Sequence, residues 1–347
     1  RRDFTINALY YDILGEELVD PLGGVEDVFA MRIRAAKENA EETLNDDGLR
    51  IVRMARFAAE LNFMVDPALC QAARKFSYYL SDITPDRKQI ELKKILLSDI
   101  KYKSFKGAIN ASKPKKGMMI LKESGALKFV IPDLCLGAGV KQNEKYHAHD
   151  VLMHGICVMA ETPPDYALRL AGLMHDIAKP FVLEQTGKMV GHDVAGETLA
   201  RKTLNDLRTP KAVIKETVLL IRNHMFDLKG EAKTNTIKKK AGEMGFDHFR
   251  KLIALRRADV AGSGMNTEDA SADHWERVLN EMISSHTPKT IADLDIDGKT
   301  LMAALSISEG EKVGQLLKRL HARVLLSPGQ NKKEQLIVLA KQILKEL

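Results

Sequence analysis

Apolar residues recur at helical spacing along much of this chain. Residues 49–61 are the clearest example, because side chains three or four positions apart fall on one face of a helix; the apolar ones are Ile51, Met54, Ala55, Ala58 and Leu61. Proline is favoured in the first turn of a helix, so Asp66-Pro67 and Thr84-Pro85 predict the starts of two further helices. The second of them continues the helical pattern to Leu96.

Strand and loop signals are fewer. Residues 4–13 form a mixed, strand-like stretch, and a turn is predicted at 21–24. A basic loop is predicted at 113–117, followed by a short helix to Leu127 and a turn at 131–133. Residues 168–180 predict a helix that Pro180 ends, and an amphipathic helix is expected over 332–347. Together these patterns predict a mainly α fold with a few strands near the N-terminus.

Composition agrees with a helical, water-soluble protein. Aromatic residues make up only 5% of the 347 positions, hydrophobic residues 45% and charged residues 29%. The net charge of +6 permits a polyanionic partner without requiring one. The cysteines, Cys70, Cys135 and Cys157, are far apart, which excludes a C-x-x-C zinc site and favours a reducing, cytoplasmic setting. No apolar run approaches the ~20 residues that span a bilayer, so no membrane partner is expected.

Three charged motifs open the chain. They are Arg1-Arg2-Asp3-Phe4-Thr5-Ile6-Asn7-Ala8, then Gly23-Gly24 with Asp27, then Asp46-Asp47 with Arg50. This succession resembles the class II template-independent nucleotidyltransferases, which comprise the CCA-adding tRNA nucleotidyltransferases and the bacterial poly(A) polymerases. The resemblance implies that Arg2 and Asp3 hold ribose and phosphates. It also implies that Asp47 and Arg50 pair with the base and that Arg53 and Arg56 face the nucleotide.

The residue types suit this selection. ATP and CTP present an amino donor beside a ring-nitrogen acceptor, which a carboxylate beside a guanidinium complements. UTP and GTP present the opposite order, so such a pair rejects them. Asp46 departs from the glutamate usual in the family. Taken alone, residues 45–47 equally suit a helix cap and the arginines a solvated face, and Asn7 and Asp27 either fix a turn or contact substrate.

The resemblance also implies a division of the chain and a metal. Its regions are the remainder of a nucleotidyltransferase head with residual palm strands (1–36), a neck of nucleotide-selecting helices (37–98), a body (99–144), an HD domain (145–286) and a helical tail (287–347). In the resembled family a D-x-D that binds Mg²⁺ precedes the R-R-D motif. No D-x-D stands there in this sequence, so no catalytic residue is assigned and the chain alone is expected not to transfer nucleotides.

Histidines gather in the fourth region, where eight of the ten lie between positions 147 and 274. His154, His175-Asp176 and Asp259 resemble the H…HD…D set of the HD phosphohydrolase superfamily. The resemblance implies a divalent metal at these residues, and His192 and His224 match the extra histidines of two-metal members. Imidazole and carboxylate ligands suit Mn, Ni, Co or Fe, and also Mg²⁺. His147 and His149 are expected to support the ligands or to lie on the surface.

Lysine runs are candidate RNA contacts, although such runs are more often solvated surface. They are Lys113, Lys115 and Lys116, then Lys238, Lys239 and Lys240, with Arg256-Arg257 and Lys332-Lys333 as further candidates. The expected function is CCA addition to tRNA 3′ ends from CTP and ATP. The alternatives are poly(A) addition, metal-dependent phosphohydrolase or phosphodiesterase activity of the HD region, and an inactive RNA-binding piece.

Overall fold

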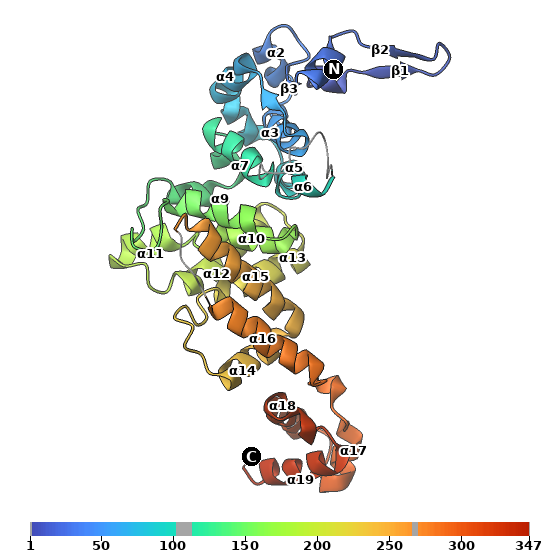
Figure 1. Cartoon of the computed structure of the whole chain (residues 1–347), viewed down its shortest axis with the longest axis vertical. Helices are drawn as coiled ribbons and strands as arrows, with labels where there is room; N and C mark the ends of the chain where they lie inside the picture. Colours follow the sequence, from blue (N-terminus) through green and yellow to red (C-terminus); the bar gives the residue numbers. More distant parts are fainter. Residues whose placement is uncertain (1, 102–112, 266–269, 347) are drawn as a thin grey trace. The chain divides into compact units, whose positions relative to one another are not determined.

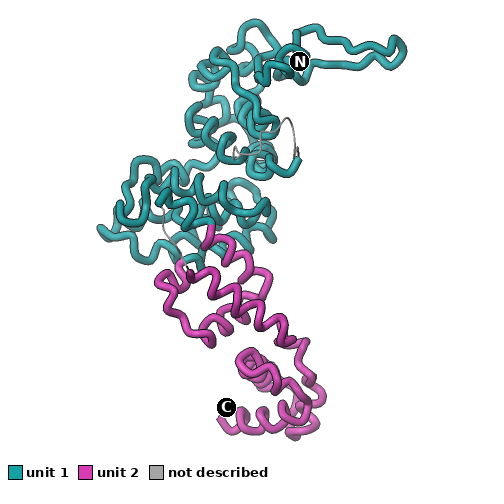
Figure 2. The backbone as a smooth tube through the Cα atoms, in the orientation of Figure 1, with its two compact units in different colours: residues 1–224, 258–267 teal, residues 225–257, 268–347 magenta. Residues whose placement is uncertain are grey.

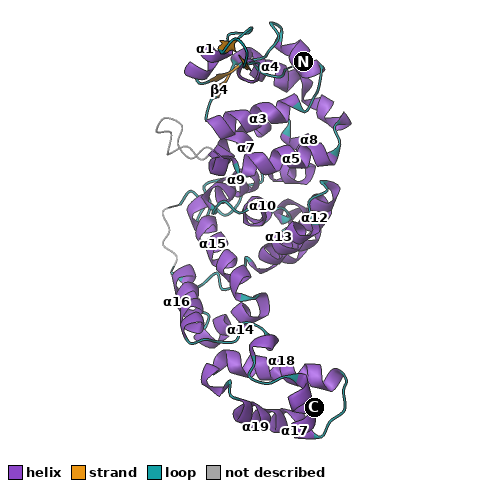
Figure 3. Ribbon diagram, turned by 90° about the vertical axis from the view of Figure 1, so that its right-hand side faces the viewer, coloured by secondary structure: helices purple, strands orange, loops and turns teal. Residues whose placement is uncertain are grey.

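The computed structural model describes residues 2–101, 113–265 and 270–346, and it confirms the mainly α fold. Two compact units divide the chain (Figure 2). Unit 1 contains residues 1–224 and 258–267, and unit 2 contains residues 225–257 and 268–347. Figure 3 shows that helices build both units, with a few strands confined to the N-terminal part. Arg1 of the first motif lies outside the described residues.

The strands form two small sheets near the N-terminus (Figure 1). Strands β1 (Tyr10–Asp12) and β2 (Glu17–Val19) pair antiparallel, and β3 (Arg32–Ile33) pairs parallel with β4 (Met64–Val65). The strand-like stretch 4–13 is therefore a strand only at its end, since Thr5–Asn7 form the 3-10 turn η1. Thr5 is held in that turn by its backbone N–H, which donates to the Arg34 carbonyl at 3.1 Å, and by its hydroxyl, which donates to Asp27 at 2.6 Å.

Helix α3 (Arg50–Leu61) is central to the next part of unit 1 and matches its predicted range closely. Asp66 caps α4 and Pro85 opens α5, as the sequence predicts. The other elements here are α1 (Gly24–Phe29), α2 (Ala40–Asn45), α4 (Pro67–Phe76), η2 (Ser77–Asp82), α5 (Pro85–Leu96), α6 (Ser98–Lys101), α7 (Lys113–Glu123), α8 (Leu127–Val130) and η3 (Pro132–Gly137).

The predicted basic loop at 113–117 is wrong, because these residues form the first turns of α7. Pro114 is tolerated there since the first N–H groups of a helix have no intrahelical acceptor. Gly117 lies at a close helix crossing, where an added Cβ would stand 2.5 Å from Ile95 and 3.1 Å from Ala59. The segment is therefore tied to the helical core.

The remainder of unit 1 is a second helical bundle. Its helices are α9 (Val151–Glu161), α10 (Tyr166–Met174), α11 (Lys179–Thr186), α12 (His192–Asp206), α13 (Lys211–Asn223) and the end of α15 (Phe246–Gly262). Pro180 does not end the predicted helix: α10 stops at Met174, and Pro180 sits in the first turn of α11. The His175-Asp176 pair therefore lies in the turn between two helices.

Besides the start of α15, unit 2 contains α14 and the elements that follow α15. They are α14 (Thr234–Met244), α16 (Ser271–Ser284), η4 (Ile291–Asp293), α17 (Gly298–Leu305), α18 (Glu311–Leu326), η5 (Pro328–Gln330) and α19 (Lys333–Leu344). Buried Trp275 packs against Phe226 and Phe249 and donates from its indole nitrogen to Asp227 at 2.9 Å. Within the described ranges, no helix combines the length and the apolar character that crossing a membrane requires.

Candidate functional site

Asp3 of the first motif is buried and paired with α3. Its Oδ2 accepts from Arg53 Nε at 2.7 Å, and its Oδ1 accepts from the Asn7 amide at 3.1 Å. Burial opposes ionisation of Asp3, but the contacts with Asn7 and Arg53 outweigh it and hold the pKa of this carboxyl below its ordinary value. Arg2 is exposed and donates to the Tyr10 hydroxyl at 3.3 Å. The structure thus brings Asp3 and Arg53 together, while Arg2 lies beside β1.

Asp27 of the Gly-Gly motif has a structural position. It is fully buried and accepts hydrogen bonds from Thr5, Arg32 and Arg34 at 2.6, 2.6 and 2.9 Å. These contacts join η1, α1 and β3. Of the two roles left open for Asp27, the geometry favours fixing the local fold.

Asp47 and Arg50 lie at the start of α3, and each has partners within the chain. Asp47 Oδ1 accepts from the Leu49 backbone N–H at 3.0 Å, and its Oδ2 accepts from Arg87 at 2.7 Å. Arg50 is buried, with its Nη1 donating to the Thr43 carbonyl at 2.7 Å and to Asp46 at 3.1 Å. Asp46, although shorter than the usual glutamate, therefore reaches Arg50, and its pKa is lowered by the hydrogen bonds from Lys37, first, and from Arg50.

Arg56 faces the interior of the helical core. It is 6% exposed, pairs with Glu91 at 3.0 Å and lies over the Phe57 ring at 4.0 Å. We call Asp3, Asp46, Asp47, Arg50 and Arg53 the α3 cluster, since these residues lie at the start of α3 or contact it. The Arg56 side chain points away from this cluster's charged groups and into the helical core, where it contacts Glu91 and Phe57.

The candidate RNA lysines lie in different units. In α7, Lys113 donates to the Glu60 carbonyl and Lys116 to Asn62, both at 3.1 Å. Lys115 lies between them. In α14, Lys240 pairs with Glu243 at 3.7 Å and lies over the Phe226 ring, with Lys238 and Lys239 on the same helix. Lys113 and Lys116 thus make contacts that hold α7 against the end of α3.

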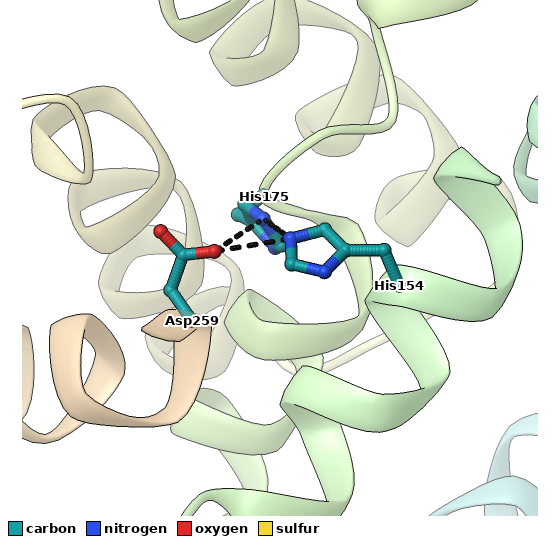
Figure 4. Close-up of side chains that lie close together, drawn as sticks. All are labelled: His154, His175 and Asp259. Atoms are coloured by element: carbon teal, nitrogen blue, oxygen red, sulfur yellow. Dashed lines mark hydrogen bonds and ion pairs between the residues drawn. The ribbon is translucent and has the colours of Figure 1, made fainter. Parts of the chain in front are cut away.

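Six side chains of the second bundle converge on one buried centre, called here the HD cluster. They form two groups, and within each group the possible ligand atoms lie within 4.8 Å of one another. The first group is His154, His175 and Asp259, and the second is Asp176, His192 and His224. Figure 4 shows the first group, with His154 Nε2 3.0 Å from Asp259 Oδ1 and 3.2 Å from His175 Nε2. In the second group, His192 Nε2 lies 3.1 Å from His224 Nε2 and 3.1 Å from Asp176 Oδ1.

Backbone carbonyls set the tautomer of all four imidazoles. Each Nδ1 lies within hydrogen-bond distance of a carbonyl oxygen, at 2.7 to 3.3 Å. Because a carbonyl only accepts, Nδ1 carries the proton, and in the neutral ring Nε2 presents a lone pair. Two pairs of Nε2 lone pairs then face each other, at 3.2 and 3.1 Å. A cation between them would relieve this repulsion, and metal-binding imidazoles are commonly oriented by such a hydrogen bond at the other ring nitrogen.

Asp176 joins the two groups. Its Oδ1 faces His192 and His224, and its Oδ2 lies 3.1 Å from His175 and 3.7 Å from His154. Both oxygens are buried, and neither receives a hydrogen bond of good geometry from any residue that the structure describes. A buried, ionised carboxylate without such bonds fits a divalent cation on each side. The residues present therefore fit a metal centre.

Charges in the HD cluster shift the pKa values in opposite directions. Burial alone disfavours the ionised carboxylate, but His175 and Lys179 hold the pKa of Asp176 well below its ordinary value. Burial likewise opposes charge on His175, yet Asp176 raises the pKa of this histidine. Burial lowers the pKa of His224 despite the nearby Asp176, and it lowers that of His147 to about 4, with His154 adding to the effect. His147 stacks edge-on against His154 at 4.6 Å between ring centroids.

Glycines bring the ligand-bearing helices together. A Cβ on Gly155 would stand 2.6 Å from the Leu173 carbonyl, and one on Gly262 would stand 2.6 Å from the Val158 nitrogen. Gly262 and Gly172 also supply the carbonyls that orient His154 and His175. Backbones this close leave no room for a side chain.

Sequence reasoning missed several polar residues at the two clusters. Arg87 contacts Asp47 from α5, forty positions along the chain, so no local pattern marks it. Gln142, which accepts a hydrogen bond from Lys179 at 2.6 Å beside the HD cluster, is equally unmarked. Lys179 carries a signal, since it stands three residues after Asp176, a spacing that brings side chains to one side of a helical turn.

Comparison with known proteins finds matches in two parts of the chain. Residues 155–271 match the HD domain family, and residues 1–34 match the Poly A polymerase head domain family. The A-adding tRNA nucleotidyltransferase of Deinococcus radiodurans is 28% identical, over 94% of this chain and 74% of that protein. The CC-adding tRNA nucleotidyltransferase of Thermus thermophilus is also 28% identical, over 92% and 71%. The Multifunctional CCA protein of Neisseria meningitidis is 27% identical, over 88% and 73%.

A solved structure supports the fold. The CCA-adding enzyme of Bacillus stearothermophilus in complex with CTP superposes with a TM-score of 0.67 at 21% identity, over 99% of this chain and 73% of that one. The similarity thus runs through both units and includes the segments that carry the two clusters. Over most of its length the chain is thus similar to tRNA nucleotidyltransferases that add A or CC, and it contains regions that match the Poly A polymerase head domain and the HD domain families.

Proposed function

We propose that the protein carrying this chain is a tRNA nucleotidyltransferase that uses CTP and ATP. The observation that carries the proposal is the α3 cluster, in which Asp47 and Arg50 stand one helical turn apart at the start of a buried helix. Relatives named as A-adding and CC-adding tRNA nucleotidyltransferases, and one named Multifunctional CCA protein, support the same activity. The polynucleotide partner in this proposal is a tRNA acceptor end.

The proposed selection uses the remaining hydrogen-bond capacity of the Asp47/Arg50 pair. Carboxylate oxygens accept more than one hydrogen bond, so Asp47 can accept from an amino group while Arg87 and the Leu49 N–H hold its plane. Arg50 is fixed through Nη1 by Asp46 and Thr43. Arg53 and Asp3 lie beside the pair, where the cation offsets phosphate charge and Asp3 faces the sugar.

In the proposed reaction, the 3′-hydroxyl of the RNA attacks the α-phosphate of the nucleotide and pyrophosphate leaves. Mg²⁺, when bound, supplies the charge that stabilises the transferring phosphate. The residues of this chain select the base and hold the nucleotide. They do not supply the attacking group.

Nucleotide incorporation tests the proposal. The protein carrying this chain is mixed with Mg²⁺ and tRNA that ends before the CCA sequence, with CTP, ATP or both. Incorporation of C and then A is expected. Incorporation of A alone on any RNA 3′ end would identify a poly(A) polymerase, and incorporation of neither would overturn the proposal.

The HD cluster favours a second function, which we propose as metal-dependent hydrolysis of a phosphoester. His154, His175, Asp176 and Asp259 would hold a first metal, and Asp176, His192 and His224 would hold a second. Bound metal supplies charge that polarises the phosphate and lowers the pKa of water. In the hydrolysis, a water oxygen bonds to phosphorus, the bond to the leaving oxygen breaks, and a proton passes to the leaving group.

Which metal the cluster takes is part of this proposal: the donor set favours Mn²⁺, Ni²⁺, Co²⁺ or Fe²⁺, with Mg²⁺ as the harder alternative. Each metal is tested by dialysis and metal analysis, and then with bis(p-nitrophenyl) phosphate and a 2′,3′-cyclic nucleotide. Hydrolysis with at least one metal, absent from Asp176→Asn, is expected. A protein that binds none of them would overturn the proposal.

A further inference from the structure

Lys179 is a buried cation at the edge of the HD cluster, and the metal-ligand assignments leave it without a role. It opens α11 and is 9% exposed. Its Nζ lies 2.6 Å from Asp176 Oδ2 and 2.6 Å from Gln142 Oε1. Lysine is rarely buried to this extent without a partner or a function. Its position next to a proposed metal ligand therefore requires a reason.

Gln142 holds Lys179 from a loop that is fixed at several points. Gln142 is 9% exposed and donates to the His149 carbonyl at 3.4 Å. In the same loop, the Gly139 N–H donates to Asp150 at 2.9 Å and the Ala148 N–H to the Ser263 carbonyl at 2.9 Å. The amide oxygen of Gln142 is therefore a placed acceptor, and it directs one of the three N–H groups of Lys179.

The contact of Lys179 with Asp176 is of a different kind. Nζ and Oδ2 are close, but Oδ2 receives no hydrogen bond of good geometry from the described residues. The contact is thus an attraction between charges. Metal ions on either side of Asp176 would neutralise that carboxylate and weaken its hold on the ammonium, while the bond to Gln142 would remain.

The same Asp176 oxygen would be a metal ligand and is already a neighbour of Lys179, so the ammonium lies at the margin of the proposed coordination sphere. An anion bound there meets Nζ at close range. Lysine is a compact point charge that commonly contacts phosphate in proteins. The alternative is that Lys179 orients Asp176. That role would need a directed hydrogen bond from Lys179 to the carboxylate, and the geometry lacks one.

We propose that Lys179 binds a non-bridging oxygen of the substrate phosphate at the HD cluster, and that Gln142 positions Lys179 for this contact. The inference rests on the metal centre proposed above. It predicts that Lys179 affects the affinity for phosphate without affecting the affinity for metal.

The test compares wild-type protein with Lys179→Gln, Lys179→Arg and Gln142→Leu, each loaded with Mn²⁺. Metal content is measured by elemental analysis, binding of inorganic phosphate by calorimetry, and KM and kcat with bis(p-nitrophenyl) phosphate. Lys188→Gln, an exposed lysine beyond the end of the same helix, is the matched control.

In Lys179→Gln we expect unchanged metal content and a Kd for phosphate raised about tenfold, with KM raised in parallel. Lys179→Arg is expected to retain part of the affinity, and Gln142→Leu to show a smaller loss than Lys179→Gln. Lys188→Gln is expected to match wild type.

Loss of metal from Lys179→Gln would assign Lys179 to ligand support and overturn the inference, as would an unchanged Kd for phosphate. Wild-type protein that holds metal but binds no phosphate overturns this inference and leaves the metal centre standing. Wild-type protein that holds no metal overturns both.

Discussion

In the α3 cluster each charged side chain has a hydrogen-bonded partner within the chain, whereas in the HD cluster imidazole nitrogens face one another and the Asp176 oxygens receive no hydrogen bond of good geometry from the described residues. Arg50 is fixed by Asp46 and a carbonyl, and Asp3 is fixed by Arg53. In the HD cluster, by contrast, Nε2 lone pairs meet at 3.1 and 3.2 Å around an unbonded carboxylate.

The functions proposed for the two clusters involve two kinds of ligand. A nucleotide enters and leaves in each cycle, so residues that read it need a stable geometry when it is absent, and pairing within the chain provides this. A metal ion remains bound through the reaction cycle. Its ligands therefore need no stable arrangement in the metal-free site, and they can repel one another there. The next predictions test this contrast, from the largest expected effect to the smallest.

Removal of the carboxylate shared by the two HD groups should have the largest effect. Asp176→Asn keeps the shape of the side chain but loses the charge that both ions would share, so we expect the protein to lose both. Mn²⁺ at about 1,000 times its Kd should stabilise the wild-type protein by about 4 kcal/mol, an effect that the variant should lack. Thermal unfolding with Mn²⁺ or EDTA measures it.

The exposed Asp206, which pairs with Lys202, provides the control variant Asp206→Asn. A normal metal content in Asp176→Asn would contradict the bridging position of Asp176.

A variant of Arg56 distinguishes a packing role of this residue from a role in nucleotide binding. Arg56→Met should leave Glu91 and Glu60 buried without their guanidinium partner and lower the free energy of unfolding by about 2–3 kcal/mol. Urea denaturation checks this. The double variant Arg56→Met/Glu91→Leu should recover part of the loss. Unchanged stability together with weakened ATP binding would instead assign Arg56 to the nucleotide.

Asp47→Asn should weaken the binding of CTP and ATP about tenfold, because one acceptor for the amino group is lost. Binding of UTP should not fall, since Asp47 gives it no favourable contact. Calorimetry with the protein carrying this chain measures both. Asp82→Asn, an exposed change in η2, is the control, and equal affinities in Asp47→Asn and wild type would refute base reading by Asp47.

The smallest effect is expected where α6 meets α10. Burial opposes ionisation of Asp99, but Arg169 outweighs it and lowers the pKa of Asp99 below 3.8. Since the folded-state pKa is depressed, the stabilisation is present above about pH 4 and is lost as pH falls through the folded-state value. Asp99→Asn should cost about 1 kcal/mol at pH 7, after allowance for partial exposure, and less at pH 3.

Denaturation at both pH values tests this difference. Asp86→Asn, in the exposed pair with Arg208, should cost almost nothing at either pH. An equal cost of Asp99→Asn at pH 7 and pH 3 would contradict the role of the carboxylate charge.

Local rules predicted the helical parts well where one signal dominated. The period of residues 49–61 predicted α3 nearly to the residue, and the prolines at 67 and 85 predicted the starts of α4 and α5. They failed where one residue type serves two purposes. Pro180 reads equally as the end of one helix or the start of another, and the lysines of 113–117 suit a loop as well as a first helical turn.

For the sites, the order of histidines and aspartates pointed to residues that the structure brings together. The sharing of Asp176 between two groups was not predictable, because it depends on how α12 and α13 lie against the turn after α10. Gln142 and Arg87 act across tertiary contacts and leave no pattern in their own neighbourhoods. The roles proposed for the nucleotide-binding residues stay predictions until the binding experiments are done.

The glycines at the helix crossings beside the HD cluster restrict which natural variants of this protein can be tolerated. Gly155 and Gly262 never touch a metal, yet an alanine at either would collide with a neighbouring backbone at 2.6 Å and displace His154 or Asp259. A variant of this protein is therefore expected to lose metal binding when a methyl group is added at a position that carries no metal ligand. A survey of tolerated substitutions should find these glycines as restricted as the ligands themselves.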